Sequence, residues 1–231
     1  MKQDQPDPAP KADARDLTEE GALALLANRD LQGKVIEELA RSPEPMKSRR
    51  VLQAVIAHPR TPRHISLPRT RHLYTLELMM LALSPAVGAD LKMAAEDVIL
   101  SRLSDITAGE RLTLAKRAST RIAAALLLDP EERVMQAALE NGRLTESCVV
   151  RALQSPQANE AFVQRVCGHP RWSLQRDIRL ALLRNPHTPL ARVAHFAASL
   201  PANLLSSLLD GAKPEVKQEL QAELRHRQAR P

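Results

Sequence analysis

Aromatic residues are almost missing from this 231-residue sequence, which has one Trp, one Tyr and two Phe. Glycine is also scarce, with only seven residues. Because β-strands favour aromatic and β-branched residues and their turns use glycine, this composition argues against a β-sandwich or barrel. A core made of Leu, Ala, Val and Ile instead suits closely packed helices.

Long apolar runs and cysteines are scarce as well. No run approaches the ~20 apolar residues that a membrane-spanning helix needs, and the first residues, MKQDQPDPAPKADARD, lack the apolar core of a signal peptide. The two cysteines, Cys148 and Cys167, form no C-x-x-C motif, so we expect reduced core residues and no metal site. We therefore expect a cytoplasmic protein without a cofactor.

Proline marks the helix ends along most of the chain. In residues 173–190, one helix is predicted to end at Asn185-Pro186 and the next to begin at Thr188-Pro189, with the Thr188 hydroxyl as its cap. The same kind of helix end recurs, with Gly142 once in place of proline, at Pro43, Pro59, Pro130, Pro156, Pro170, Pro186 and Pro201. From Pro130 onward, two successive steps span 26 to 31 residues, which is the period of a helical repeat.

An apolar stripe accompanies these helix ends. Eight residues before each end lie Val35, Val51, Ile122, Val134, Cys148, Phe162, Ile178 and Val193. Four residues before each end lie Leu39, Val55, Leu126, Ala138, Ala152, Val166, Leu182 and Ala197. A spacing of four puts both positions on one helix face. Because a lone helix of this length is marginal in water, the stripes are predicted to be buried by neighbouring helices.

Two features resemble known helical repeats. The junctions His58-Pro59-Arg60-Thr61-Pro62 and Asn185-Pro186-His187-Thr188-Pro189 resemble those of variant leucine-rich repeats, and Asp177-Ile178-Arg179 resembles the second helix of a HEAT repeat. The resemblance covers residues 35–209 and implies an all-α fold, a right-handed α-solenoid of stacked antiparallel helix pairs used as a binding scaffold. One type of variant-repeat protein holds an iron–sulfur cluster on a group of cysteines that this chain lacks, so the resemblance implies no cofactor.

The repeat pattern also divides the chain. Residues 1–15 have no apolar period and are expected to form a disordered tail. Residues 16–212 are predicted to form the repeat domain. Residues 213–231 are expected to supply a capping helix and tail, because Val216, Leu220 and Leu224 form a single apolar face.

Positive charge is concentrated in residues 45–76. This window has no Asp or Glu, and its charge of +7 exceeds the +6 of the whole chain. Pro68 is predicted to interrupt a helix there and leave residues 60–72 irregular, and irregular segments on a rigid scaffold often carry function. The residues predicted to bind a partner, either an acidic protein or phosphate, are Lys47, Arg49, Arg60, Arg63, Arg69 and Arg71.

Several other polar residues have a structural and a functional interpretation. A base recurs nine residues before five of the helix ends, at Lys34, Arg50, Arg121, Arg133 and Arg192. It could follow nucleic-acid phosphates, but pairing with carboxylates of adjacent helices is the stronger expectation. His58, His169 and Asn185, each directly before a proline, are expected to bond backbone carbonyls at helix ends.

Trp172 and Asp177 resemble the tryptophan and aspartate of alkylpurine DNA glycosylases, which hold DNA in a HEAT-like array. Such sites need several aromatic residues around the damaged nucleotide, and this chain has four in total. We therefore expect Trp172 to pack at a helix N-terminus and Asp177 to pair with a base on a neighbouring helix.

The sequence contains no nucleophile elbow, phosphate-binding loop or HExxH motif, so we expect a protein without enzymatic activity. Two functions remain. The first is a scaffold for protein–protein interaction with a basic surface around residues 47–71. The second is binding of nucleic acid through the duplex backbone, because scarce aromatic residues disfavour stacking on single strands.

Overall fold

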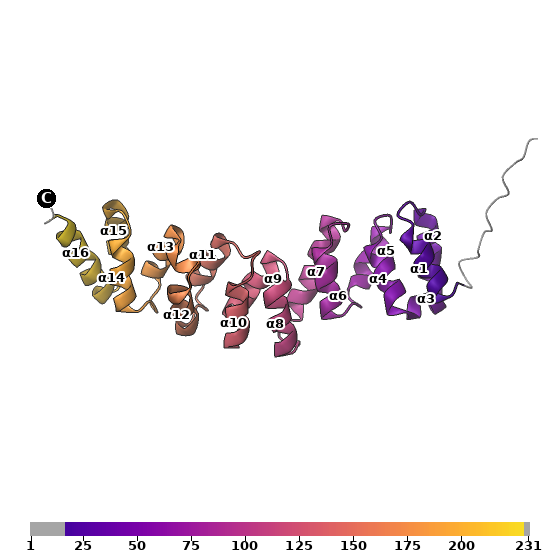
Figure 1. Cartoon of the computed structure of the whole chain (residues 1–231), viewed down its shortest axis with the longest axis horizontal. Helices are drawn as coiled ribbons and strands as arrows, with labels where there is room; N and C mark the ends of the chain where they lie inside the picture. Colours follow the sequence, from indigo (N-terminus) through magenta and orange to yellow (C-terminus); the bar gives the residue numbers. More distant parts are fainter. Residues whose placement is uncertain (1–16, 229–231) are drawn as a thin grey trace, which may run out of the picture. The chain divides into compact units, whose positions relative to one another are not determined.

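The computed structural model describes residues 17–228, which form α-helices and short 3-10 helices and no strand (Figure 1). The predicted all-α class is therefore confirmed. The chain divides into two compact units, with the boundary between Arg102 and Leu103. The predicted tail, residues 1–15, lies outside the described residues. None of the described helices combines the length and the apolar character that crossing a membrane would require.

The first unit contains seven helices among the described residues. They are α1 (Glu19–Ala27), α2 (Gly33–Arg41), α3 (Pro43–Lys47), α4 (Arg49–Ala57), α5 (Arg63–Thr70), α6 (Thr75–Leu83) and α7 (Ala89–Ser101). Helix α4 packs against α1, α3 and α5, and α7 packs against α5 and α6. Ala22, Ile36, Leu39, Val51 and Val55 form the centre of its apolar core.

The second unit continues the alternation of short helices and turns. Its helices are α8 (Ala108–Arg117), α9 (Thr120–Ala125), η1 (Leu126–Leu128), α10 (Glu132–Leu139), α11 (Glu146–Gln154), α12 (Glu160–Gly168), η2 (Trp172–Leu174), α13 (Arg176–Arg184), α14 (Leu190–Ala198), α15 (Ala202–Leu208), η3 (Leu209–Gly211) and α16 (Pro214–Gln228). Helix α10 packs against α8 and α12, whereas α11 packs against α9 and α13. Alternate helices are therefore neighbours in this unit.

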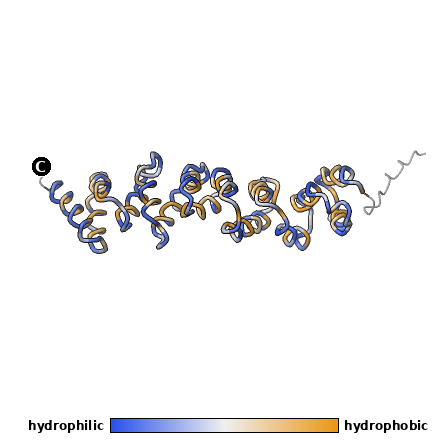
Figure 2. Tube along the Cα trace, turned by 90° about the horizontal axis from the view of Figure 1, so that it is seen from below, coloured by the Kyte–Doolittle hydropathy of each residue, from blue (hydrophilic) through white to orange (hydrophobic). Residues whose placement is uncertain are grey.

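The predicted apolar stripe is confirmed. All eight residues four positions before the helix ends are buried, from Leu39 to Ala197. Among the residues that lie eight positions before each helix end, Val35 and Cys148 are half-buried and the other six are buried. Hydrophobic and hydrophilic residues accordingly alternate along the helices in Figure 2.

Six of the eight predicted helix ends lie directly before their proline, whereas those predicted at Gly142 and Pro201 come one residue earlier, with Glu140 and Ser199 as the C-caps. The residue before the proline is the C-cap at Ser42, His58, Asp129, Ser155, His169 and Asn185, with ψ between 116° and 140°. A residue that precedes proline is pushed out of the helical region by the proline ring, so the helix stops there.

The threonines of the two Pro-x-Thr-Pro junctions close the preceding helix. The Thr188 hydroxyl donates to the Leu182 carbonyl at 2.6 Å, and the Thr61 hydroxyl donates to the Val55 carbonyl at 2.6 Å. The prediction that Thr188 caps the next helix through its hydroxyl is therefore wrong. Its hydroxyl instead adds a second donor to the Leu182 carbonyl at the end of α13, which also accepts from the N–H of Asn185 at 3.0 Å.

Pro68 lies inside α5 and does not interrupt it. Two side chains of the same helix donate to its carbonyls: Thr70 Oγ1 to Ser66 at 3.0 Å and Arg69 Nη1 to Ile65 at 3.4 Å. Proline removes one N–H from the ladder, and side-chain donors of this kind help to satisfy carbonyls in the last turn. The predicted irregular segment is therefore helical over residues 63–70.

At several helix ends, a side chain makes a hydrogen bond to the backbone carbonyl of an earlier helix end. His58 Nε2 bonds the Asn28 carbonyl at 3.0 Å, and Asn185 Nδ2 donates to the Leu153 carbonyl at 2.7 Å. Asn141 Nδ2 reaches Ala115 at 2.7 Å in the same way. The partners are 26 to 32 residues apart. The prediction that His58 and Asn185 bond carbonyls at helix ends is confirmed.

Candidate functional site

The six predicted partner-binding bases do not form one surface patch. Arg60 and Arg63 lie where α5 begins. Lys47, Arg49 and Arg71 lie near the start of α4 and the end of α5, and the bond from Arg49 Nη1 to the His72 carbonyl at 2.9 Å joins these two ends. Because a helix of eight or nine residues is about 12 to 14 Å long, the two groups occupy opposite edges of the helix pair.

The first group carries exposed ion pairs. Arg60 pairs with Asp30 at 2.8 Å, and Arg63 pairs with Asp90 at 2.7 Å. The four side chains are 45% to 85% exposed. Exposed pairs of this kind contribute roughly 0 to 1 kcal/mol. The carboxylates of a partner can therefore compete for both arginines.

The second group contains two available bases. Lys47 pairs with Glu44 at 2.6 Å, and both side chains are about 70% exposed. The exposed Arg71 side chain makes no ion pair or hydrogen bond with the described residues. A partner can therefore reach Arg71 directly and can compete with Glu44 for Lys47.

Arg49 and Arg69 instead hold the first unit together. Arg49 pairs with Glu77, and its guanidinium carbon lies 3.7 Å from the centroid of the Tyr74 ring. Arg69 Nη2 donates to the Ala40 carbonyl at 3.0 Å, which links α5 to the end of α2. Using these side chains for a partner would break contacts within the unit.

Within the described part of the chain, the recurring basic position is paired with a carboxylate at Arg50 and unpaired at three of the other positions. Arg50 lies 3.7 Å from Glu19, and both side chains are exposed. Within residues 17–228, Lys34, Arg133 and Arg192 form no ion pair, so the prediction of pairing is wrong at these three positions. One carboxylate beside Arg133, that of Glu132, is bonded to Arg165 at 2.6 Å.

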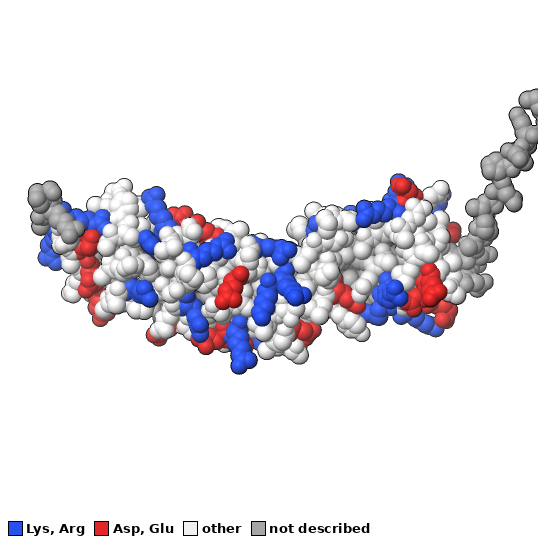
Figure 3. Space-filling model, viewed as in Figure 1, with Lys and Arg blue, Asp and Glu red and all other residues white. Residues whose placement is uncertain are grey.

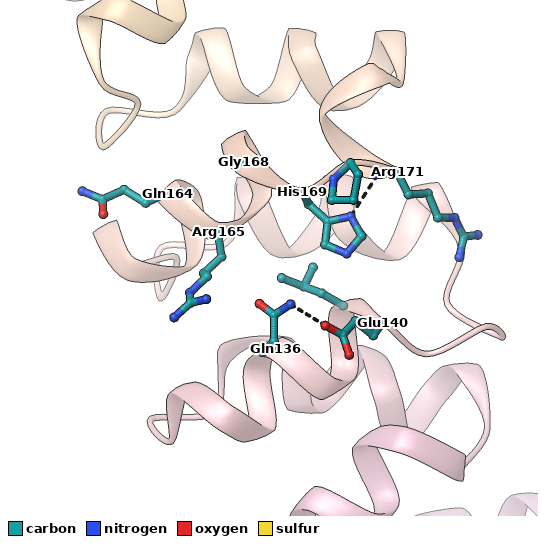
Figure 4. Close-up of a pocket in the computed structure, with 9 residues that line it drawn as sticks. Gln136, Glu140, Gln164, Arg165, Gly168, His169 and Arg171 are labelled. Carbon is teal, nitrogen blue, oxygen red and sulfur yellow. Dashed lines mark hydrogen bonds between the residues drawn. The ribbon is translucent and has the colours of Figure 1, made fainter.

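A pocket of about 460 Å³ lies between α10 and α12. Figure 4 shows Gln136 and Glu140 on α10 facing Arg165 and His169 across it. The Gln136 amide donates to Glu140 at 2.6 Å, so the polar groups on the α10 side bond one another. The opposite wall carries the guanidinium groups of Arg165 and Arg171 and the His169 ring.

The His169 ring is fixed by the turn that follows α12. Its Nδ1 accepts from the N–H groups of Arg171 at 3.2 Å and Trp172 at 3.4 Å. Unlike His58, the His169 ring makes no hydrogen bond to an earlier helix end within residues 17–228; there Trp172 Nε1 donates to the Leu139 carbonyl at 2.8 Å. The prediction that His169 bonds a helix-end carbonyl is therefore wrong.

The pKa of His169 is lowered from its ordinary value of 6.5, first by burial and further by the positive charge of Arg171, while Glu140 opposes the shift. Protonation at Nδ1 would also cost the two backbone hydrogen bonds that this nitrogen accepts. A histidine with a lowered pKa favours folding when neutral. Its contribution is fully present above pH 6.5 and is lost as the pH falls through the lowered pKa.

Replacing His169 by Asn should make stability less sensitive to acid. Asn can hold the same turn, as the Oδ1 atoms of Asn141 and Asn185 do by accepting from the N–H of Arg143 at 2.8 Å and of His187 at 2.9 Å. We expect the free energy of unfolding, measured with urea between pH 7 and 5, to fall less in the variant. In the parent protein, the NMR titration of His169 should have its midpoint below pH 6.5, and a midpoint above 6.5 would contradict this account.

Trp172 and Asp177 do not form a base-binding site. Trp172 is 1% exposed, and its ring is covered by Arg171, whose guanidinium carbon lies 4.0 Å from the ring centroid. A buried ring cannot stack on a nucleotide. Asp177 is exposed in the first turn of α13 and makes no ion pair in the described part of the chain, so the prediction that it pairs with a base is wrong.

The two cysteines differ in environment. Cys167 is buried, and burial raises the pKa of its thiol to about 11, against a smaller opposing effect of Arg192. Cys148 is half-buried on α11, where its sulfur accepts from Thr145 Oγ1 at 3.2 Å. Over residues 17–228, no three His, Cys, Asp or Glu side chains are grouped so that they could hold a metal ion.

A second cavity, which we call the α9–α11 hollow, has a volume of about 750 Å³. Its apolar wall is formed by Ala124, Ala125, Leu126, Leu128 and Ala152. Arg111, Asp129, Cys148 and Arg151 are its main polar neighbours. Sequence reasoning missed this site, because the small side chains that open it also fit the ordinary helix-packing pattern.

No family model matches this chain, and no curated protein and no solved structure gives a match to it.

Proposed function

We propose that this protein is a right-handed α-solenoid scaffold without enzymatic activity, which binds other proteins. The observation that carries the proposal is the recurring side-chain bond between helix ends, from His58, Asn141, Trp172 and Asn185 to carbonyls 26 to 33 residues earlier. Such contacts between successive repeats are the basis of solenoid stacking, and solenoids present long surfaces to partners.

The proposed partner-binding residues are Arg60 and Arg63 at one edge of the α4–α5 pair and Lys47 and Arg71 at the other. The exposed ion pairs of Lys47, Arg60 and Arg63 contribute little to folding, so a partner rich in Asp and Glu can replace Glu44, Asp30 and Asp90 at small cost. Arg49 and Arg69 drop out of this set, because their bonds lie within the first unit.

Substituting Arg60, Arg63 and Arg71 together by Ser should weaken partner capture at least tenfold and change the free energy of unfolding by only about 0.5 kcal/mol for each site. Capture is measured by quantitative mass spectrometry on proteins retained from a native cell extract. The matched control replaces three exposed, unpaired arginines of the second unit, Arg133, Arg176 and Arg184, by Ser. Equal capture by both triple variants would remove the basic surface from the proposal.

Nucleic-acid binding is the second candidate function. Figure 3 shows Lys and Arg side chains gathering on the visible face of the second unit, over α8 to α13. The separating measurement is fluorescence anisotropy with duplex DNA between about 50 and 200 mM salt, where each phosphate contact adds about 0.9 to the slope of log affinity against log salt. Micromolar binding with a slope of about 4 to 6 would favour nucleic acid. Absence of binding at low salt would leave the protein scaffold.

A further inference from the structure

The α9–α11 hollow is open to solvent and apolar on one side. Ala125 and Pro130 at its edge are exposed, whereas Leu126 and Ala152 on its wall are buried. Pockets for small molecules enclose 70% to 90% of their ligand. An open hollow of about 750 Å³ instead suits side chains that project from a larger partner.

One of the two arginines at the hollow is already satisfied. Arg111 Nε donates to Asp129 Oδ2 at 2.8 Å, and Arg111 Nη1 donates to the Ile106 carbonyl at 2.9 Å. Asp129 Oδ1 accepts from the N–H of Glu131 at 2.9 Å. This pair belongs to the fold and leaves no charge for a ligand.

Arg151 is the arginine that remains available. It is exposed and forms no ion pair or hydrogen bond with the described residues. It also borders a smaller cavity with Glu146 and Asp177, yet pairs with neither. Arg151 therefore lines the hollow next to its apolar wall and has no carboxylate partner among the described residues.

Arg151 lies five residues before the helix-ending Pro156, a position that Arg165 occupies in α12. On the two helices that pack against α11, the same position holds Ala125 and Ala181. At this place in the second unit, the long side chain of Arg151 therefore has only small neighbours at the matching positions. Two features thus coincide at one place, an unpaired guanidinium and a wall of alanines.

We propose that the α9–α11 hollow binds a segment of a protein partner in which a carboxylate neighbours a branched aliphatic side chain. The carboxylate pairs with Arg151 in the two-point geometry that a guanidinium favours. The aliphatic side chain covers Ala124, Ala125 and Ala152. This inference rests on the proposed function as a protein-binding scaffold and adds a second site to it, on the second unit.

Cys148 allows the hollow to be probed directly, because it lines the hollow one helical turn before Arg151. The raised pKa of about 11 keeps Cys167 protonated at pH 8, so thiol exchange occurs at Cys148. The probes are three mixed disulfides with 2-mercaptoethanol: 3-mercaptopropionyl-leucine, its leucinamide, and 3-mercaptopropionyl-glycine. Intact-mass measurement gives the 2-mercaptoethanol concentration at which half of the protein stays labelled.

For 3-mercaptopropionyl-leucine, the 2-mercaptoethanol concentration at which half of the protein stays labelled should be about tenfold higher than for the leucinamide or the glycine probe. Arg151→Gln should abolish the difference between acid and amide, and Ala125→Leu should abolish the preference for leucine over glycine. Arg184→Gln, which removes an exposed unpaired arginine of α13, should change neither comparison. Thermal unfolding curves establish that each variant is folded.

Equal labelling by acid and amide on the parent protein, or an unchanged preference in Arg151→Gln, would overturn the proposal. If Cys148 exchanged with no probe, millimolar N-acetyl-leucine and N-acetyl-leucinamide would make the same comparison through NMR shifts of the alanine methyl groups. Because neither experiment uses a natural partner or the basic surface, a negative result would leave the capture experiment to decide the scaffold function separately.

Discussion

Trp172→Ala should lower the free energy of unfolding by about 3 to 5 kcal/mol, which is the range for truncating a fully buried aromatic side chain. Only 1% of Trp172 is exposed, so truncation leaves a cavity in the second unit. It also removes the donor from the buried bond to the Leu139 carbonyl at 2.8 Å. Urea denaturation at pH 7 measures the change.

The variant Trp172→Phe separates these two effects. Phenylalanine keeps most of the ring but cannot donate to Leu139, so the cost should fall to about 1 to 3 kcal/mol, the penalty of an unsatisfied buried carbonyl. A loss below 1 kcal/mol for Trp172→Ala would show that this helix end does not contribute to the cooperative core of the second unit.

Asp129→Ala should cost about 3 kcal/mol, because removing one partner of a buried ion pair leaves the other charge without compensation. The side chains of Asp129 and Arg111 are 5% and 18% exposed, and their bond is 2.8 Å long. The variant also loses the acceptor for the N–H of Glu131 at the start of α10. The same urea measurement applies.

The double variant Arg111→Leu/Asp129→Leu should be less destabilised than Asp129→Ala alone, because it removes both charges together. The single variants Arg111→Leu and Asp129→Leu complete the double-mutant cycle. Effects that simply add would mean that the two residues contribute independently and would contradict the ion-pair account.

The helix ends and the buried stripe were predictable because their physics is local. A proline excludes the helical conformation for the residue before it, and this alone places the ends at His58, His169 and Asn185. Apolar residues four apart share a helix face whatever the neighbours are. The positions from Leu39 to Ala197 could therefore be assigned to the core without knowledge of the stacking.

Where a side chain has two possible hydrogen-bond or ion-pair partners, the local sequence does not predict which one it contacts. Thr188 could cap one helix or close another, and only the position of the Leu182 carbonyl decides between them. Likewise, the carboxylates that bind the basic window, Asp30, Glu77 and Asp90, all lie outside it in the sequence. The α9–α11 hollow could not be predicted for the same reason, because it depends on which helices pack against one another.

The hydrogen bonds between helix ends also run in one direction along the chain. In each of them the later helix end provides the side-chain donor and the earlier helix end provides the backbone carbonyl. Each of these carbonyls therefore needs a later segment of the chain to supply its donor. At α14 that later segment is α16, where Arg227 donates to the carbonyls of Ala197, Ala198 and Leu200. A segment of about 30 residues duplicated upstream of α16 would bring its own donor and acceptor, as contacts limited to neighbouring repeats allow. In the proposed solenoid, the chain can thus lengthen by whole repeats while Arg227 continues to complete the last one.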